Sequence, residues 1–276
     1  MTEDGERAVF FISDHTGITA EVVGHSLLAR FEGERFRFVT RPFVDSVDEA
    51  ERVVAEIDRE AQGASVRPIA FVTLTDAAIA QRLMTARALL LDIFNPHLAA
   101  LEGELESAPS PAVGRYHRIV DLSAYQTRMD AVDYALSTDD GLATQSYQRA
   151  DIILLGVSRA GKTPTCLFLG MQFGIRAANY PLADDDFDSL ALPRAVADHR
   201  DKLFGLTIDP LRLHQIRRRR KPDSRYASLD QCESEVRQGE RLYERQGIGY
   251  LNTTASSVEE IAATIMQRAG IQRRLH

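Results

Sequence analysis

The sequence predicts an α/β fold in two domains. Short apolar segments typical of buried strands alternate with helix-like segments along most of the 276 residues, and this alternation favours sheets covered by helices. The alternation stops between residues 101 and 115, where Ala108-Pro109-Ser110-Pro111 has the composition of a linker. We therefore predict an N-terminal α/β domain over residues 1–110 and a second domain, with a mostly parallel sheet, over residues 111–276.

The N-terminal elements begin with an apolar strand over residues 8–12 and a polar loop over residues 13–17. The next segment has the apolar spacing of a helix, and residues 36–40 alternate like a second strand. We expect the apolar face of the helix to contain Ile18, Val22, Val23, Leu27 and Phe31.

A second helix is predicted to begin at the capping box Ser46-Val47-Asp48-Glu49 and to end at Gly63. Residues 69–74 predict a third strand, and Asp76 is placed to cap the helix after it. The apolar residues of the second helix recur at helical spacing, at Ala50, Val53, Val54, Ile57 and Ala61.

The second half continues the same alternation. A helix over residues 126–136 precedes an apolar strand over residues 151–155, and a further helix covers residues 164–172. Further strands are predicted over residues 176–181, 204–209 and 249–253. The last helix is predicted to open with the capping box Ser256-Ser257-Val258-Glu259 and to end at Gly270.

Composition narrows the class of protein. The net charge of −7 provides no general positive field, which argues against nucleic acid as a partner. Cys166 and Cys232 lie far apart without a metal-ligand pattern, so we expect free thiols in a reducing cytoplasm. The acidic N-terminus is not followed by a long apolar run, so we predict no signal peptide, no membrane span and a cytoplasmic location.

One stretch carries most of the chemical information, and it runs Gly156-Val157-Ser158-Arg159-Ala160-Gly161-Lys162-Thr163. It matches the phosphate-binding loop pattern G-x-x-x-x-G-K-[ST] at every fixed position. The two glycines let the backbone curl around a polyphosphate, Lys162 is placed to reach a terminal phosphate, and the Thr163 hydroxyl is placed to hold Mg²⁺. A strand before the loop and a helix after it are the context that the motif requires, so we predict a P-loop kinase-like second domain that binds a nucleotide.

Several acidic residues could complete such a site. Asp209 follows an apolar strand, where it could hold Mg²⁺ or cap the helix that Pro210 begins, and the sequence leaves both open. For Asp139-Asp140-Gly141 and for Asp184-Asp185-Asp186 a polar turn is favoured over a metal contact. Asp14 lies in the loop before the first helix, where free N–H groups favour an anion, so a second phosphate or acceptor site is favoured over a plain turn.

A cationic run, Arg217-Arg218-Arg219-Arg220-Lys221, stands out in this acidic chain. It fits the solvated end of a helix, where cations favour the helix dipole. It also fits a mobile lid whose arginines neutralise a phosphoryl group, or a patch for an acidic protein partner.

The phosphate-loop stretch Leu154 to Thr165 closely resembles the bacterial phosphoenolpyruvate synthase regulatory proteins, which are relatives of the plant pyruvate, phosphate dikinase regulatory protein. The resemblance covers nearly the whole chain, although His15 stands where many relatives carry glycine and Ala160 occupies a variable position. Further strings that carry it are Phe11-Ile12-Ser13-Asp14, Asp139-Asp140-Gly141, residues 171–181, residues 202–210, residues 224–229 and residues 257–262.

The resemblance implies a bifunctional regulator of phosphoenolpyruvate synthase. Its kinase activity would use ADP to phosphorylate and inactivate the synthase on a threonine, and its phosphorylase activity would use inorganic phosphate to remove that group as pyrophosphate. The phosphate loop would hold the ADP phosphates with Mg²⁺, and Lys162 would neutralise developing charge. A general base is required, and Asp14 and Asp209 are our candidates. The sequence leaves a homodimer open.

Two other functions fit the same motif. A small-molecule P-loop kinase that uses ATP is the first alternative, since residues 251–260 resemble the final strand and helix of such enzymes. A nucleotide-sensing module without chemistry is the second.

Overall fold

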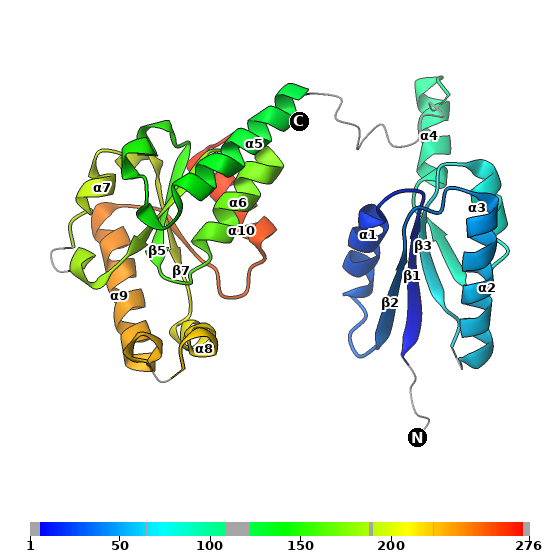
Figure 1. Cartoon of the computed structure of the whole chain (residues 1–276), viewed down its shortest axis with the longest axis horizontal. Helices are drawn as coiled ribbons and strands as arrows, with labels where there is room; N and C mark the ends of the chain where they lie inside the picture. Colours follow the sequence, from blue (N-terminus) through cyan, green and yellow to red (C-terminus); the bar gives the residue numbers. More distant parts are fainter. Residues whose placement is uncertain (1–5, 65, 109–121, 188–189, 223, 273–276) are drawn as a thin grey trace. The chain divides into compact units, whose positions relative to one another are not determined.

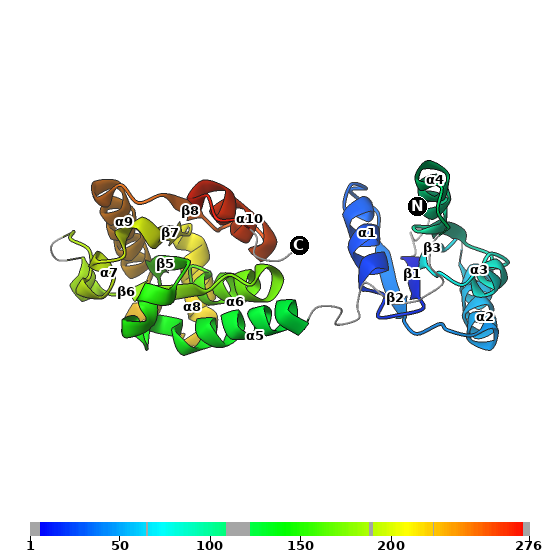
Figure 2. The same ribbon diagram turned by 90° about the horizontal axis from the view of Figure 1, so that it is seen from above.

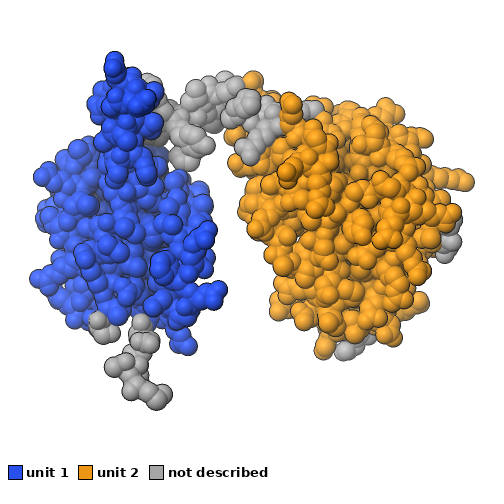
Figure 3. All heavy atoms as spheres, turned by 180° about the vertical axis from the view of Figure 1, so that it is seen from behind, with its two compact units in different colours: residues 1–120 blue, residues 121–276 orange. Residues whose placement is uncertain are grey.

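The computed structural model describes residues 6–64, 66–108, 122–187, 190–222 and 224–272. The chain divides into two compact units, residues 1–120 and 121–276 (Figure 3). The predicted boundary after residue 110, with most of the predicted linker, lies outside the described residues. Each unit contains one four-stranded parallel sheet with helices on its faces, which confirms the α/β fold class.

The two sheets share one strand order. Unit 1 contains β1 (Arg7–Ser13), β2 (Phe36–Arg41), β3 (Ile69–Thr73) and β4 (Leu89–Asp92) in the order β2-β1-β3-β4. Unit 2 contains β5 (Ile152–Val157), β6 (Ala177–Leu182), β7 (Leu203–Thr207) and β8 (Tyr250–Asn252) in the order β6-β5-β7-β8. In each sheet the first strand lies between the second and the third. Its carboxyl end is therefore the point where the strand order reverses, and ligands of such sheets bind there.

Three helices cover the two faces of the first sheet: α1 (Ile18–Leu28), α2 (Val47–Gly63) and α3 (Ala77–Leu83). The helix α4 (Asn95–Leu105) follows β4 and has no buried residue. Alternate residues of β1 enter two separate cores: Phe10 and Ile12 pack with α2 and α3, whereas Val9 and Phe11 pack with α1. Figures 1 and 2 show α1 on one side of the sheet and α2 and α3 on the other. Burial on both faces explains why β1 is apolar throughout rather than alternating.

The prediction of which residues form the buried face of α1 was wrong. Ile18 and Val22 are exposed, as are Leu27 and Phe31. The buried face consists instead of Ala20, Gly24 and Leu28. Small residues let α1 lie close to the sheet, since a Cβ at Gly24 would come within 2.4 Å of the Phe11 ring. A face made of small side chains gives little hydrophobic signal in a sequence, and this is why the larger apolar residues misled the prediction.

The predicted starts of these helices are confirmed, except that the last helix begins one residue later than predicted. Ser46 accepts the backbone N–H of Glu49, and Asp76 caps α3 through two backbone N–H groups. The capping box of the last helix consists of Ser257 and Glu260, one residue later than predicted.

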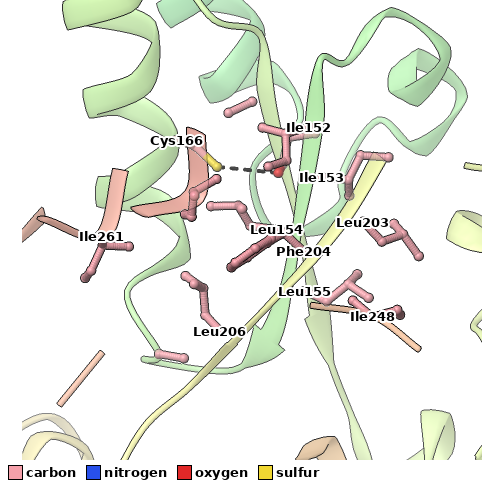
Figure 4. Close-up of a cluster of buried hydrophobic side chains, with 14 of the residues drawn as sticks. Ile152, Ile153, Leu154, Leu155, Cys166, Leu203, Phe204, Leu206, Ile248 and Ile261 are labelled. Atoms are coloured by element: carbon pink, nitrogen blue, oxygen red, sulfur yellow. Dashed lines mark hydrogen bonds between the residues drawn. The ribbon is translucent and has the colours of Figure 1, made fainter. Parts of the chain in front are cut away.

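Unit 2 contains α5 (Leu122–Ser137), α6 (Lys162–Phe173), α7 (Arg194–Ala197), α8 (Pro210–Arg220), α9 (Leu229–Gln246) and α10 (Val258–Ala269), with short 3₁₀ turns between them. All six residues of β5 are buried, and Figure 4 shows the side chains of Ile152, Ile153, Leu154 and Leu155 packed with those of β7. The Cys166 thiol points to the Ala178 carbonyl, and both cysteines are buried and free. Tyr243 of α9 donates to the Leu155 carbonyl, so α9 is fixed on one face of the sheet. Within the described part of the chain, none of the helices has the length and apolar character needed to cross a membrane.

The close approach of α1 to the sheet can be tested by substitution at Gly24, because there packing and helix propensity have opposite effects on stability. Alanine is the better helix former at both Gly24 and Gly103, and a Cβ at Gly103 of α4 would meet nothing within 4 Å. We expect Gly24→Ala to lower the free energy of unfolding by about 1–3 kcal/mol through overpacking, and Gly103→Ala to leave it equal or up to about 1 kcal/mol higher. Amide hydrogen exchange of β1 peptides measures both effects, and equal exchange rates in the two variants would contradict the clash.

Candidate active site at the phosphate-binding loop

The phosphate-binding loop joins β5 to α6 at the carboxyl end of the sheet. Each of its two glycines is required for a different structural reason. A Cβ on Gly156 would lie 2.7 Å from the Leu206 carbonyl oxygen, so β7 passes too close for any side chain. Gly161 has φ of 92° and precedes the first turn of α6, a left-handed conformation that favours glycine. The first glycine therefore serves close packing and the second serves the curl of the loop.

The residues between the glycines are fixed at several points. Val157 ends β5 and is buried, whereas Ser158 is half-buried and Arg159 is exposed with φ of 79°. Ala160 is buried, and its carbonyl accepts a hydrogen bond of 3.1 Å from the Thr253 hydroxyl. A non-glycine residue in the left-handed region, as at Arg159, is uncommon and occurs often at functional loops.

Lys162 carries a charged group that is almost fully buried. Its side chain is only 4% exposed, and Nζ donates a hydrogen bond of 3.1 Å to the Val157 carbonyl. Burial lowers the pKa of Lys162 to about 8, against the opposing influence of the Asp140 and Asp139 carboxylates. Among the described residues, no carboxylate forms an ion pair with this ammonium.

Thr163 is oriented by Asp139, an acid for which the sequence favoured a turn over a metal contact. Its hydroxyl donates to Asp139 Oδ1 at 2.7 Å, and the Asn179 amide donates to the same oxygen at 2.6 Å. Asn179 in turn accepts the backbone N–H of Asp140 at 3.1 Å. The turn favoured for residues 139–141 is present as a 3₁₀ turn, and it also delivers a carboxylate to the phosphate loop.

This pair of groups suits Mg²⁺. The Thr163 hydroxyl and the Asp139 carboxylate are hard oxygen ligands, and Mg²⁺ takes most of its remaining ligands from substrate phosphates and water. Among the described residues, histidine, cysteine and acidic side chains form no cluster of three or more arranged to hold a metal by themselves.

Asp209 lies two residues beyond β7 and caps α8, as one of its two interpretations predicted. Its carboxylate accepts the backbone N–H of Arg212 at 3.0 Å, and its own N–H donates to the Thr254 hydroxyl. The role of Asp209 in holding metal or accepting a proton stays a prediction.

Asp14 lies in unit 1, at the carboxyl end of β1. Its Oδ2 accepts hydrogen bonds from the hydroxyl and the backbone N–H of Thr75, and Oδ1 lies 3.3 Å from Nδ1 of His15. Asp14 therefore belongs to a different unit from Lys162, Thr163 and Asp209.

The acidic run at residues 184–186 forms a 3₁₀ turn, as favoured. Asp186 accepts hydrogen bonds from the Ala183 backbone and the Tyr180 hydroxyl, and Asp184 accepts one from Gln231.

The cationic run divides into two parts. Residues 217–220 form the last turn of α8, which matches the interpretation as a helix end, and Arg218, Arg219 and Arg220 are exposed. Arg217 is fully buried and forms an ion pair with Glu235 of α9 at 2.6 Å. Burial alone would lower the pKa of Arg217, but the hydrogen bond and charge of Glu235 outweigh burial and raise it.

Arg217 also supports the phosphate loop. One guanidinium nitrogen donates to the Ser158 carbonyl at 3.1 Å and another to the Tyr226 carbonyl at 3.0 Å. The guanidinium lies 4.1 Å from the centre of the Tyr226 ring, and the Tyr226 hydroxyl lies 2.9 Å from Ser158 Oγ. The first arginine of the run is thus a structural centre that α8, α9 and the loop share.

Comparison with known proteins agrees with this geometry. The family model described as kinase/pyrophosphorylase matches residues 9–266. The chain belongs to the kinase/pyrophosphorylase family. A relative from Ectopseudomonas mendocina is 53% identical over 98% of this chain and 99% of its own length, and one from Stutzerimonas stutzeri is 52% identical over the same shares. Both are provisionally named phosphoenolpyruvate synthase regulatory proteins.

Family membership fits the residues that sequence reasoning undervalued. Asp139 belongs to one of the strings that carry the resemblance, and this was the only signal that could have raised it above a turn. Asn179 and Tyr226 also lie in strings that carry the resemblance, whereas Glu235 lies outside them, and the roles of all three depend on partners that only the fold brings together.

The burial of Lys162 predicts a titration that responds to ligand. The lysines of the chain are Lys162, Lys202 and Lys221, so each Cε signal can be assigned in ¹³C-labelled protein by substitution. We expect Lys162 to titrate near pH 8 in the free protein. ADP with Mg²⁺ should move its pKa upward, because nearby phosphate charge favours the ammonium form. An unchanged titration at saturating ADP would exclude direct contact of Lys162 with phosphate.

The Asp139 carboxylate predicts a metal-specific defect. Asp139→Asn keeps an acceptor oxygen for Thr163 and Asn179 but removes the negative charge. We expect the gain in ADP affinity on adding Mg²⁺ to fall about 10- to 100-fold, with metal-free ADP binding retained. Calorimetry with and without Mg²⁺ measures this, and Asp186→Asn, which alters a turn carboxylate of the same unit, is the matched control. An equal loss in both variants would point to general electrostatics instead.

Proposed function

We propose that the chain is a bifunctional serine/threonine kinase and phosphorylase that regulates phosphoenolpyruvate synthase from the cytoplasm. ADP-dependent phosphorylation of a target threonine would inactivate the synthase, and phosphate-dependent removal of that group, with formation of pyrophosphate, would reactivate it. The names of the relatives support the target, and the family description supports the paired kinase and pyrophosphorylase chemistry.

The two reactions share one chemical core. In the kinase direction the threonine oxygen attacks the β-phosphorus of ADP, the bond to the bridging oxygen breaks, AMP leaves, and the hydroxyl proton passes to a base. In the phosphorylase direction an oxygen of inorganic phosphate attacks the phosphothreonine phosphorus. The bond to the threonine oxygen then breaks, that oxygen takes a proton, and pyrophosphate leaves. ADP and pyrophosphate both contain a diphosphate, so one nest that seats a diphosphate could serve both reactions.

The residues have matching roles in this proposal. The backbone of Gly156 to Thr163 would hold the diphosphate, and Lys162 would neutralise charge on the bridging oxygen. Thr163 would hold Mg²⁺, which neutralises phosphate charge when bound, and Asp139 would orient the Thr163 hydroxyl. Asp14 and Asp209 remain the candidates for the base that accepts the threonine proton.

The observation that carries the proposal is the buried Lys162 at the start of α6. An ammonium that is 4% exposed, and whose hydrogen bond among the described residues goes to the neutral Val157 carbonyl, gains most from a polyanion. Such a centre suits phosphoryl transfer, which depends on positioning and on charge neutralisation.

The deciding experiment follows phosphate from ADP to the synthase. Purified chain is mixed with histidine-phosphorylated phosphoenolpyruvate synthase, Mg²⁺ and ADP labelled at the β-phosphate, and label on threonine is measured. We expect transfer by the wild type and a loss of at least about 100-fold in Lys162→Met. Arg241→Met, which removes an exposed arginine of the same unit outside the cationic run, should retain transfer.

Other outcomes would separate the alternatives. No transfer from ADP, together with ATP-dependent phosphorylation of a metabolite, would favour the small-molecule kinase. Binding of ADP and of the synthase without any transfer would favour a nucleotide-sensing module.

A further inference from the structure

A basic pocket lies between α8 and the start of α9 and has no part in the proposed reaction. It has a volume of about 610 Å³ and is lined by His214 and Arg218 of α8, by Ser224, Arg225 and Ala227 of the turn that follows, and by Ser228. Ser228 is the N-cap residue of α9, which is 18 residues long. In Figure 1 α8 and α9 occupy the lower part of unit 2.

The pocket is cationic. The described residues that line it include two arginines and no acidic residue. The ion pairs found among the described residues involve neither Arg218 nor Arg225, whereas the neighbouring Arg217 is paired with Glu235. In a chain of net charge −7, such a pocket is a local exception.

Hydrogen bonds already engage the other polar groups of the pocket. His214 Nδ1 lies 2.6 Å from the Ala227 carbonyl, which can only accept, so Nδ1 carries the proton and Nε2 is the remaining ring nitrogen. The hydroxyls of Ser224 and Ser228 donate to the carbonyls of Lys221 and Arg225. The guanidinium groups of Arg218 and Arg225 are therefore the donors left for a ligand, and their planar forks match phosphate oxygens.

The pocket is fixed to the phosphate loop through two neighbouring residues. Arg217 precedes Arg218 and donates to the Ser158 carbonyl, and Tyr226 follows Arg225 and contacts Ser158 Oγ. Each arginine of the pocket is thus adjacent in sequence to a residue that touches the loop. The stacking of Arg217 on Tyr226 holds both walls together.

We propose that this pocket is a second phosphate-binding subsite, separate from the nest of residues 156–163 and specific for a phosphate or phosphate monoester. The ligand is inorganic phosphate or a phosphoryl group carried by a protein side chain, since both present the same oxygens. The subsite goes beyond the proposed function and concerns binding alone, so it holds for any reaction at Lys162.

The test observes the pocket directly. The full-length Lys162→Met variant, in which the phosphate loop lacks its lysine, is labelled on histidine and titrated with inorganic phosphate at constant ionic strength set by chloride. We expect a saturable shift of the His214 imidazole signals, which Lys162→Met does not abolish. A parallel titration with a short phosphothreonine peptide distinguishes the sources: tighter binding of the peptide assigns the subsite to a protein-borne group, and tighter binding of phosphate assigns it to the free ion.

Paired arginine variants provide the matched control. Arg218→Gln/Arg225→Gln should weaken binding at least tenfold, whereas Arg219→Gln/Arg220→Gln removes the same charge from exposed residues outside the pocket and should change it less than twofold. Arg218→Lys/Arg225→Lys keeps the charge without the forks and provides a second reading if the glutamine pair is unstable; it should also weaken binding. Equal weakening by both glutamine pairs, or a shift that never saturates, would overturn the proposal. Loss of kinase transfer with this binding intact would refute only the proposed function.

Discussion

An ammonium group held away from water at the end of β5 is the feature on which the site depends. Burying a charge is costly unless another charge compensates it. The nearest partner of Lys162 is a neutral carbonyl, and Asp139 and Asp140 act on it from a distance. The polyphosphate that we propose as ligand would supply negative charge beside this ammonium.

A second constraint fixes the shape of the loop. Gly156 passes the Leu206 carbonyl too closely for a side chain, so the exit of β5 is set by the neighbouring strand β7. On the outer side, Arg217 joins the loop to α8 and α9 through Ser158, Tyr226 and Glu235. A buried ion pair of this kind contributes little net stability, but breaking one partner leaves an unpaired charge. The loop is thus positioned from both sides before any ligand arrives.

Sequence reasoning predicted the parts of this molecule in which residue type dictates conformation. The phosphate loop could be predicted because Gly161 must adopt a positive φ, and the strand β5 because it is buried on both faces. The buried face of α1 could not be predicted, since Ala20 and Gly24 pack closely without a strong apolar pattern. The helix α9 was not predicted for a related reason, because its buried face includes Glu235 and Gly239. The place of Asp139 depends on Thr163 and Asn179, which lie 24 and 40 residues away, and no local pattern contains that information.

The two sheets are built from separate parts of the chain, and this has a consequence for how the chain folds. Every strand of the first sheet lies within residues 7–92, and every strand of the second lies within residues 152–252. Neither sheet needs a strand from the other unit, so hydrogen bonding in the first can be completed while the second is still being synthesised. Domains generally fold as units in the order in which the ribosome releases them. The phosphate loop therefore emerges after the strands of the first unit have been released, and that unit need not wait for it.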